Sequence, residues 1–100
     1  MPTYIIRFRF TPTALEKISD SANRLDAFKE FFHTQGVETQ HFFLTLGEFD
    51  GEIVVTAPDD RTLAKTILAW TSRGSITTQT VRAFTEDEYR EICGDLPSRT

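Results

Sequence analysis

The sequence predicts an α+β fold in which a four-stranded antiparallel sheet carries its helices on one face. Three segments alternate between apolar and polar residues with a period of two, and a fourth, threonine-rich segment follows nearer the C-terminus. Two amphipathic segments of helical spacing flank a central pair of strands, which a glycine-bracketed turn joins. The predicted order is strand, helix, two strands, helix and strand.

Residues 4–10 form the first expected strand, with aromatic and aliphatic side chains on one face and Arg7 and Arg9 on the other. Thr11 is placed to cap the following helix, and Pro12 suits its first position. After a break near residue 20, a second helix carries an apolar stripe and ends at a glycine in the left-handed conformation. The stripe and its glycine are Leu25, Phe28, Phe32 and Gly36.

The central strands are expected over residues 38–46 and 52–57. On the first of them, the face toward the helices is Phe42, Leu44 and Leu46, and the other face is Thr39, His41, Phe43 and Thr45. Asp50-Gly51 is a common hairpin dipeptide, but a turn at Gly47-Glu48 pairs the two apolar runs more fully. We therefore expect the turn at Gly47-Glu48.

A third helix and the last strand complete the pattern. Asp59 and Asp60 precede the helix as capping residues, and its core face is Leu63, Ile67 and Trp70. The last strand covers residues 76–84. Thr85 with Glu88 three residues later forms a capping box, which opens a C-terminal helix that stops at Pro97.

This order, βαββαβ with right-handed crossovers, is the ferredoxin-like arrangement. The length of 100 residues predicts one domain, residues 1–100. Helices cover one face of the sheet, so the other face is left to bind a ligand, pair with a second sheet or meet water.

Polar side chains gather on that uncovered face, where an arginine suits a carboxylate ligand and a histidine suits proton transfer. On the last strand we choose the side that holds Thr78, Thr80 and Arg82, because Val81 and Ala83 suit the helix side. The expected ligand-binding residues are Arg7, Arg9, His41, Glu52 and Arg82.

The composition excludes several classes of function. A net charge of −4 and few basic clusters argue against nucleic-acid binding. We expect no membrane segment, no cofactor and no metal, since His33 and His41 do not form a ligand cluster. The single Cys93 fits a reducing compartment, so a cytoplasmic location is expected. Nine phenylalanines exceed what one small core can hold, which favours self-association.

Several separated blocks resemble the GYD domain family. They are MPTYI at residues 1–5, LTLGEFD at 44–50, APDD at 57–60, RAFT at 82–85 with Glu88, and LP at 96–97. The resemblance implies a ferredoxin-like fold of the dimeric α/β-barrel type and no settled activity. The tyrosine of the family motif is Phe49 here. We expect Gly47 to supply an unusual backbone angle and Asp50 to bond nearby amides.

The residues leave three functions open and do not determine one. The first in rank is a homo-oligomeric module, a homodimer or larger, that binds a small anionic or hydroxylated ligand on the open face. The second is a cofactor-free enzyme of the dimeric α/β-barrel kind, such as an oxygenase or isomerase, with His41 moving a proton. The third is a purely structural interaction subunit.

Overall fold

The computed structural model describes residues 1–98, so the last two residues of the predicted domain, 99 and 100, lie outside the description. The elements follow the predicted order. They are β1 (Thr3–Phe10), α1 (Pro12–Glu16), η1 (Ile18–Asp20), α2 (Ser21–Thr34), β2 (Glu38–Leu44), β3 (Gly51–Thr56), α3 (Asp60–Thr71), β4 (Ile76–Ala83) and α4 (Glu86–Gly94).

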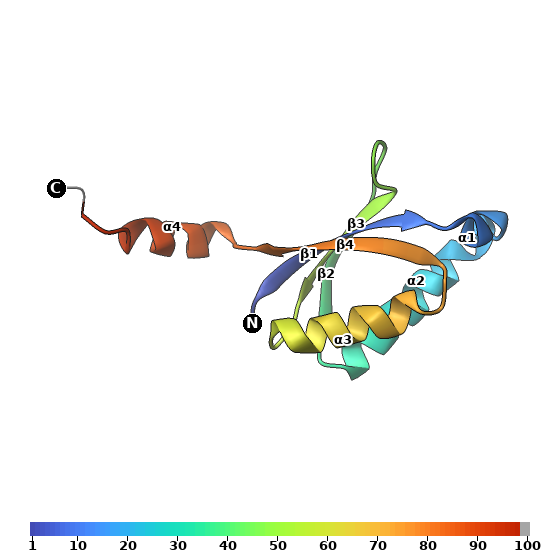
Figure 1. Cartoon of the computed structure of the whole chain (residues 1–100), viewed down its shortest axis with the longest axis horizontal. Helices are drawn as coiled ribbons and strands as arrows, with labels where there is room; N and C mark the ends of the chain where they lie inside the picture. The colour runs from blue at the N-terminus through green and yellow to red at the C-terminus, as the bar shows by residue number, and fades with distance from the viewer. Residues whose placement is uncertain (99–100) are drawn as a thin grey trace.

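The four strands form one sheet in the order β2-β3-β1-β4, and every neighbouring pair is antiparallel. Helices α2 and α3 lie together on one side of this sheet (Figure 1). The ferredoxin-like α+β fold predicted from the sequence is therefore confirmed. Helix α4 instead extends from the end of the sheet, which makes the molecule long and thin at 59 × 31 × 18 Å (Figure 1).

The core lies between the sheet and helices α2 and α3. Aromatic rings dominate it, because Phe28 stacks on Phe32 with ring centroids 3.8 Å apart and meets the edge of Trp70 at 5.4 Å. The side chains that pack against these rings are fully or almost fully buried. They include Tyr4, Ile6, Phe8, Ile53, Val55 and Leu63.

Local capping chemistry appears where the sequence predicts it. Thr11 accepts a hydrogen bond from the Ala14 amide and Asp59 accepts one from the Thr62 amide. Thr85 and Glu88 form the predicted capping box of α4. This helix ends at Gly94, three residues before the predicted stop at Pro97. Within residues 1–98, no helix is long and apolar enough to cross a membrane.

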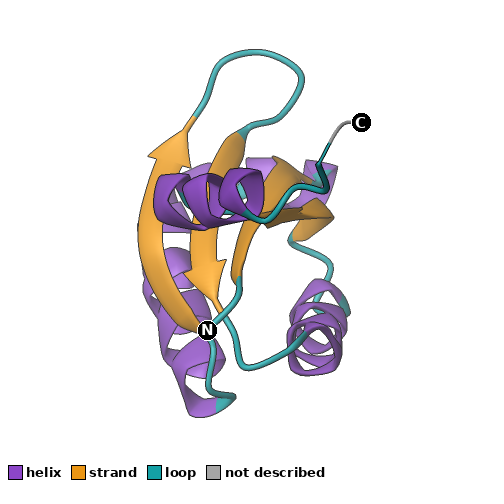
Figure 2. Cartoon of the chain, turned by 90° about the vertical axis from the view of Figure 1, so that its left-hand side faces the viewer, coloured by secondary structure: helices purple, strands orange, loops and turns teal. Residues whose placement is uncertain are grey.

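The register of Leu44 with Gly51 centres the β2–β3 connection on Gly47-Glu48, as predicted. The predicted extension of β2 to Leu46 is wrong, because β2 ends at Leu44 and residues 45–50 form a loop beyond the strands (Figure 2). Gly51 already belongs to β3, where it pairs with Leu44 and Phe8. Leu46 was expected beneath the helices and is instead fully exposed. Asp50 ties the loop to β1, and its carbonyl oxygen also accepts a hydrogen bond from the Thr45 amide at 2.9 Å, which closes the loop across residues 46–49.

The predicted orientation of β4 is also wrong. Tyr4 pairs with Arg82 and Ile6 pairs with Thr80, while Ile5 pairs with Val81. Residues directly opposite in an antiparallel pair share a face. Arg82 and the other two residues of its side, Thr78 and Thr80, therefore point to the helix side with the core of β1, and Val81 lies on the open face.

An irregularity in β2 changes one further assignment. Thr39 pairs with Val55 and His41 pairs with Val54, so the register shifts between Thr39 and His41. Val55 is completely buried under the helices. The bulge thus places Thr39 on the helix side, contrary to the prediction, while His41 stays on the open face.

Candidate functional site

The open face of the sheet has an aliphatic row at its centre. Ile5 of β1 pairs with Val54 of β3 on one side and with Val81 of β4 on the other. His41 of β2 pairs with Val54 and continues the row across the fourth strand. The three aliphatic side chains are half-buried. A continuous strip of hydrocarbon therefore crosses three strands, whereas the binding residues predicted from the sequence were all polar.

The neighbouring row is polar, and its charges are paired. Arg7 donates from Nε to Glu52 Oε1 at 3.0 Å, and the two side chains are 36% and 35% exposed. Phe43 lies opposite Glu52 and Gln79 lies opposite Arg7 in the register. Four predicted residues, Arg7, Arg9, His41 and Glu52, thus share the face that was expected for them.

His41 is exposed and its ring stacks on that of Phe43, with centroids 6.1 Å apart and planes inclined by 19°. Both residues belong to β2, which is an edge strand. The arrangement places the imidazole on a surface rather than at the base of a pocket. It does not provide the enclosure from water that proton transfer to a small substrate uses.

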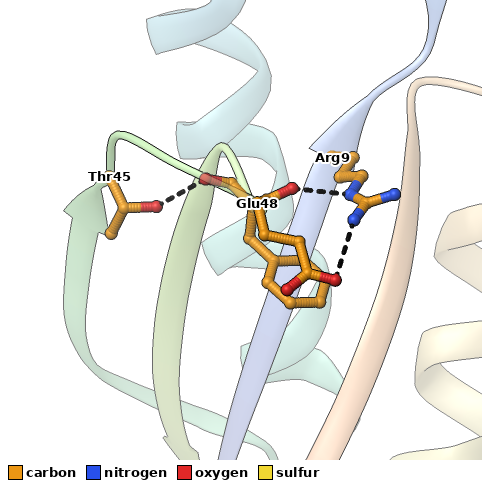
Figure 3. A network of polar contacts seen from close by, with 4 residues as sticks. Arg9, Thr45 and Glu48 are labelled. Atoms are coloured by element: carbon orange, nitrogen blue, oxygen red, sulfur yellow. Dashed lines mark hydrogen bonds and ion pairs between the residues drawn. The ribbon is translucent and has the colours of Figure 1, made fainter.

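Arg9 is held by the loop between β2 and β3. Its Nε donates to the carbonyl oxygen of Glu48 at 2.7 Å, and a second nitrogen lies 3.3 Å from Glu48 Oε1 (Figure 3). The guanidinium also lies over the ring of Phe49, 5.0 Å from its centroid. Phe49 therefore offers a ring face to a cation at the position where the family motif has a tyrosine.

The other two motif residues of this loop do what the sequence predicts. Gly47 has φ of 130°, a conformation that favours glycine. Asp50 accepts a hydrogen bond from the Phe10 amide at 2.8 Å. Thr45 braces the loop by donating its hydroxyl to the carbonyl of Phe49 at 2.8 Å (Figure 3).

Arg82 is separated from the other predicted residues by the sheet itself. Its guanidinium lies 5.7 Å from the Tyr4 ring centroid and 4.3 Å from that of Phe84. Tyr4 is buried and donates its hydroxyl to Asp60 Oδ1. Burial, followed by the hydrogen bond and the charge of Asp60, raises the pKa of Tyr4 to about 12. Arg82 therefore belongs to the surroundings of Tyr4.

A cavity lies on the helix side of the sheet, at the end where β1 finishes and β4 begins. It is an apolar cavity of about 560 Å³ between the sheet and the helical segments, α1, η1 and α2 among them. Phe8, Phe10 and Phe42 form its sheet side, and Leu15 and Ile18 form part of its rim. Arg24 is the basic residue of the lining. Among residues 1–98, no group of three or more His, Cys, Asp or Glu side chains is placed to hold a metal ion.

The comparisons with known proteins agree with the resemblance noted in the sequence. The sequence model of the GYD domain family matches residues 4–93. The chain belongs to the GYD domain family. A relative from Thermus thermophilus is 32% identical over 85 residues, which cover 84% of this chain and 90% of that protein. That relative is named glutamine synthetase and cystathionine beta-lyase binding protein. No solved structure is significantly similar to this chain.

The alternation of the sequence already placed Ile5, Phe43 and Val54 on the open face, but no binding role was predicted for these apolar residues. Val81 was expected on the helix side, because its orientation depends on the pairing of β4 with β1 and no local pattern shows it. The cavity is built from all four strands and several helical segments, and no local pattern marks such a site.

Proposed function

We propose that this protein is an interaction module that binds another protein through the open face of its sheet. The observation that carries the proposal is the aliphatic row of Ile5, Val54 and Val81 beside an already paired Arg7 and Glu52. An apolar centre next to satisfied polar groups is typical of protein interfaces. A site for a small anion needs an arginine whose charge is not neutralised by its own neighbour.

The name of the Thermus relative supports a protein partner over a small molecule, because it describes a protein that binds two enzymes. Glutamine synthetase and cystathionine beta-lyase from the organism of this chain are therefore the first partners to test. The aliphatic row extends across three neighbouring strands, which suits a protein partner, since sites that hold small ligands are usually concave pockets.

The experiment measures binding of purified glutamine synthetase and of cystathionine beta-lyase to the immobilised protein. Ile5→Glu places a charge in the aliphatic row and is expected to weaken binding by more than about tenfold, because a desolvated charge at an interface centre is costly. Leu68→Glu is the matched control, since Leu68 is exposed on α3 and lies away from the open face. It is expected to leave binding unchanged.

Equal binding by Ile5→Glu and wild type would show that the open face is not the binding surface. If neither enzyme bound the wild-type protein, the proposal that these two enzymes are its partners would be wrong. The homodimer predicted from the sequence would pack the same faces together. If Ile5→Glu turns a dimer of the free protein into single chains, the open face belongs to self-association instead.

The small-ligand hypothesis for Arg7, Arg9, His41 and Glu52 stays a prediction with its own test. A small carboxylate or sugar that bound this face would raise the thermal midpoint by mass action. The paired state of Arg7 and the engagement of Arg9 with Glu48 argue against it. The exposed position of His41 gives no support to the enzyme hypothesis.

A further inference from the structure

Two apolar features of this chain lie apart, and no other helix or strand within residues 1–98 covers either of them. One is the rim of the helix-side cavity, and the other is the C-terminal arm, which we define as residues 84–98. Eleven large hydrophobic side chains are exposed in the described part of the chain, and eight of them belong to these two features. They are Leu15, Ile18, Leu44 and Leu46 at the rim and Phe84, Tyr89, Ile92 and Leu96 on the arm.

The arm contains a helix that needs a surface to pack against. Tyr89, Ile92 and Cys93 lie on one stripe of α4, and Leu96 follows two residues after the end of the helix at Gly94. Helix α4 makes no extensive contact with any other described element, and it points away from the body (Figure 1). A helix of nine residues is marginal in water even with a good cap, because most helical stability in proteins comes from packing of the apolar face.

The arm does not reach the cavity of its own chain. The cavity includes Ile76 at the start of β4, whereas the arm leaves from Ala83 at the other end. Strand β4 is eight residues long, so Ile76 and Ala83 at its two ends lie roughly 23 Å apart. With two extended linker residues and α4 intact, Ile92 lies only about 16 Å from Ala83 at most. The arm therefore does not reach the rim at the Ile76 end of its own cavity, and a segment of another molecule is needed to cover the rim there.

We propose that the arm of one copy docks its apolar stripe in the helix-side cavity of a second copy, and that two copies exchange arms in this way. The cavity of about 560 Å³ offers aromatic walls from Phe8, Phe28 and Phe42. The arm presents an apolar stripe to this apolar lining, and its five carboxylates and one arginine can stay in water around the rim. Two-fold exchange buries both unpartnered features at once.

This proposal is independent of the proposed function. The exchanged arms occupy the helix side of the sheet, so the open face around Ile5 stays free for a partner protein. Ile5→Glu is accordingly expected to keep the arm-exchanged dimer, whatever its effect on enzyme binding.

The single native cysteine gives a direct test of the contact. A variant with Leu46→Cys and Cys93→Ser carries its only thiol at the cavity rim, and a tagged wild-type chain carries its only thiol on the arm. The two proteins are mixed and oxidised mildly. A disulfide between different chains is expected to form on the order of tenfold faster than when a matched variant replaces the Leu46→Cys protein. The matched variant is Leu68→Cys with Cys93→Ser, whose thiol lies on the exposed side of α3.

A second measurement follows the mass of the free protein. Sedimentation over a range of concentrations is expected to show wild type at twice the chain mass and Ile92→Asp at the single-chain mass of 11.4 kDa. Glu91→Ala is the control, because Glu91 lies on the face of α4 opposite the apolar stripe. It is expected to behave as wild type.

Several outcomes would overturn the proposal. A wild-type protein that stays a single chain at all concentrations contradicts the exchange. Equal disulfide rates for the thiols at positions 46 and 68 show that the arm docks elsewhere, even if Ile92→Asp dissociates the dimer. A small apolar molecule that stays bound to the wild-type protein in native mass spectrometry would show that this molecule, and not the arm, fills the cavity.

Discussion

Asp50 accepts a hydrogen bond from the Phe10 amide, with Oδ2 2.8 Å from the nitrogen, and this contact ties the β2–β3 loop to the end of strand β1. The backbone reinforces it, since the Asp50 amide donates to the carbonyl of Phe8 at 2.8 Å. Asp50 therefore fixes where β3 begins and also holds the end of β1. The cavity wall formed by Phe8 and Phe10 lies directly behind this junction.

Asp50→Ala is expected to lower the free energy of unfolding by about 1–2 kcal/mol, because it removes a partly buried hydrogen bond to a carboxylate. Urea denaturation measures the change. Glu48→Ala in the same loop is the control and is expected to cost less than about 0.5 kcal/mol, because the Arg9–Glu48 ion pair is exposed. Equal losses for the two variants would mean that the Phe10 contact is not what holds the loop.

The two glycines of this region are expected to respond differently to alanine. Gly47 has φ of 130° with open space around it, so Gly47→Ala costs about 1–2 kcal/mol of backbone strain. A side chain at Gly51 would overlap the Phe8 ring and lie 2.7 Å from the Phe43 carbonyl oxygen. Gly51→Ala is therefore expected to cost about 3 kcal/mol through overpacking. Denaturation of both variants gives the order, and a larger loss for Gly47→Ala would contradict it.

Local signals in the sequence were sufficient for most of the fold. The alternation in β1, the Thr11 cap with Pro12 and the Thr85–Glu88 capping box each depend on residues a few positions apart. The face shared by Arg7, Arg9, His41 and Glu52 followed from the same alternation. Such features are readable because their physical cause lies within one element.

The errors lie where the cause is a pairing between distant segments. Strand β4 has β-branched residues on both sides, so only its register with β1 decides that Arg82 faces Tyr4 and Val81 faces Ile5. The loop after Leu44 was misjudged because its geometry depends on a bond from Asp50 to β1. The pairing of Arg7 with Glu52, which weakens the case for an anion site, likewise joins residues 45 positions apart.

Tyr4 gives the protein a pH dependence on the alkaline side. Its folded-state pKa of about 12 exceeds the ordinary value of 10.0, so the neutral phenol is favoured in the fold. This contribution is fully present below pH 10.0 and is lost as the pH rises through about 12. Wild type is expected to lose more stability over this window than Tyr4→Phe, which has no phenol to ionise. Thermal midpoints measured at intervals across the window check the difference, and parallel curves would contradict it.

Asp59 gives a dependence of the opposite sign. The carboxylate accepts hydrogen bonds from Thr62 at the start of α3, and these bonds lower the pKa of Asp59 below its ordinary value of 3.8. A depressed pKa contributes stability that is present above 3.8 and is lost as the pH falls through the lower, folded-state value. Asp59→Ala is therefore expected to unfold at a lower temperature than wild type at neutral pH, and the gap is expected to narrow in acid. Asp59→Asn keeps a neutral cap, and its midpoint should lie between the two at neutral pH. A gap that stayed constant down to pH values well below 3.8 would show that the charge of Asp59 does not contribute to capping α3.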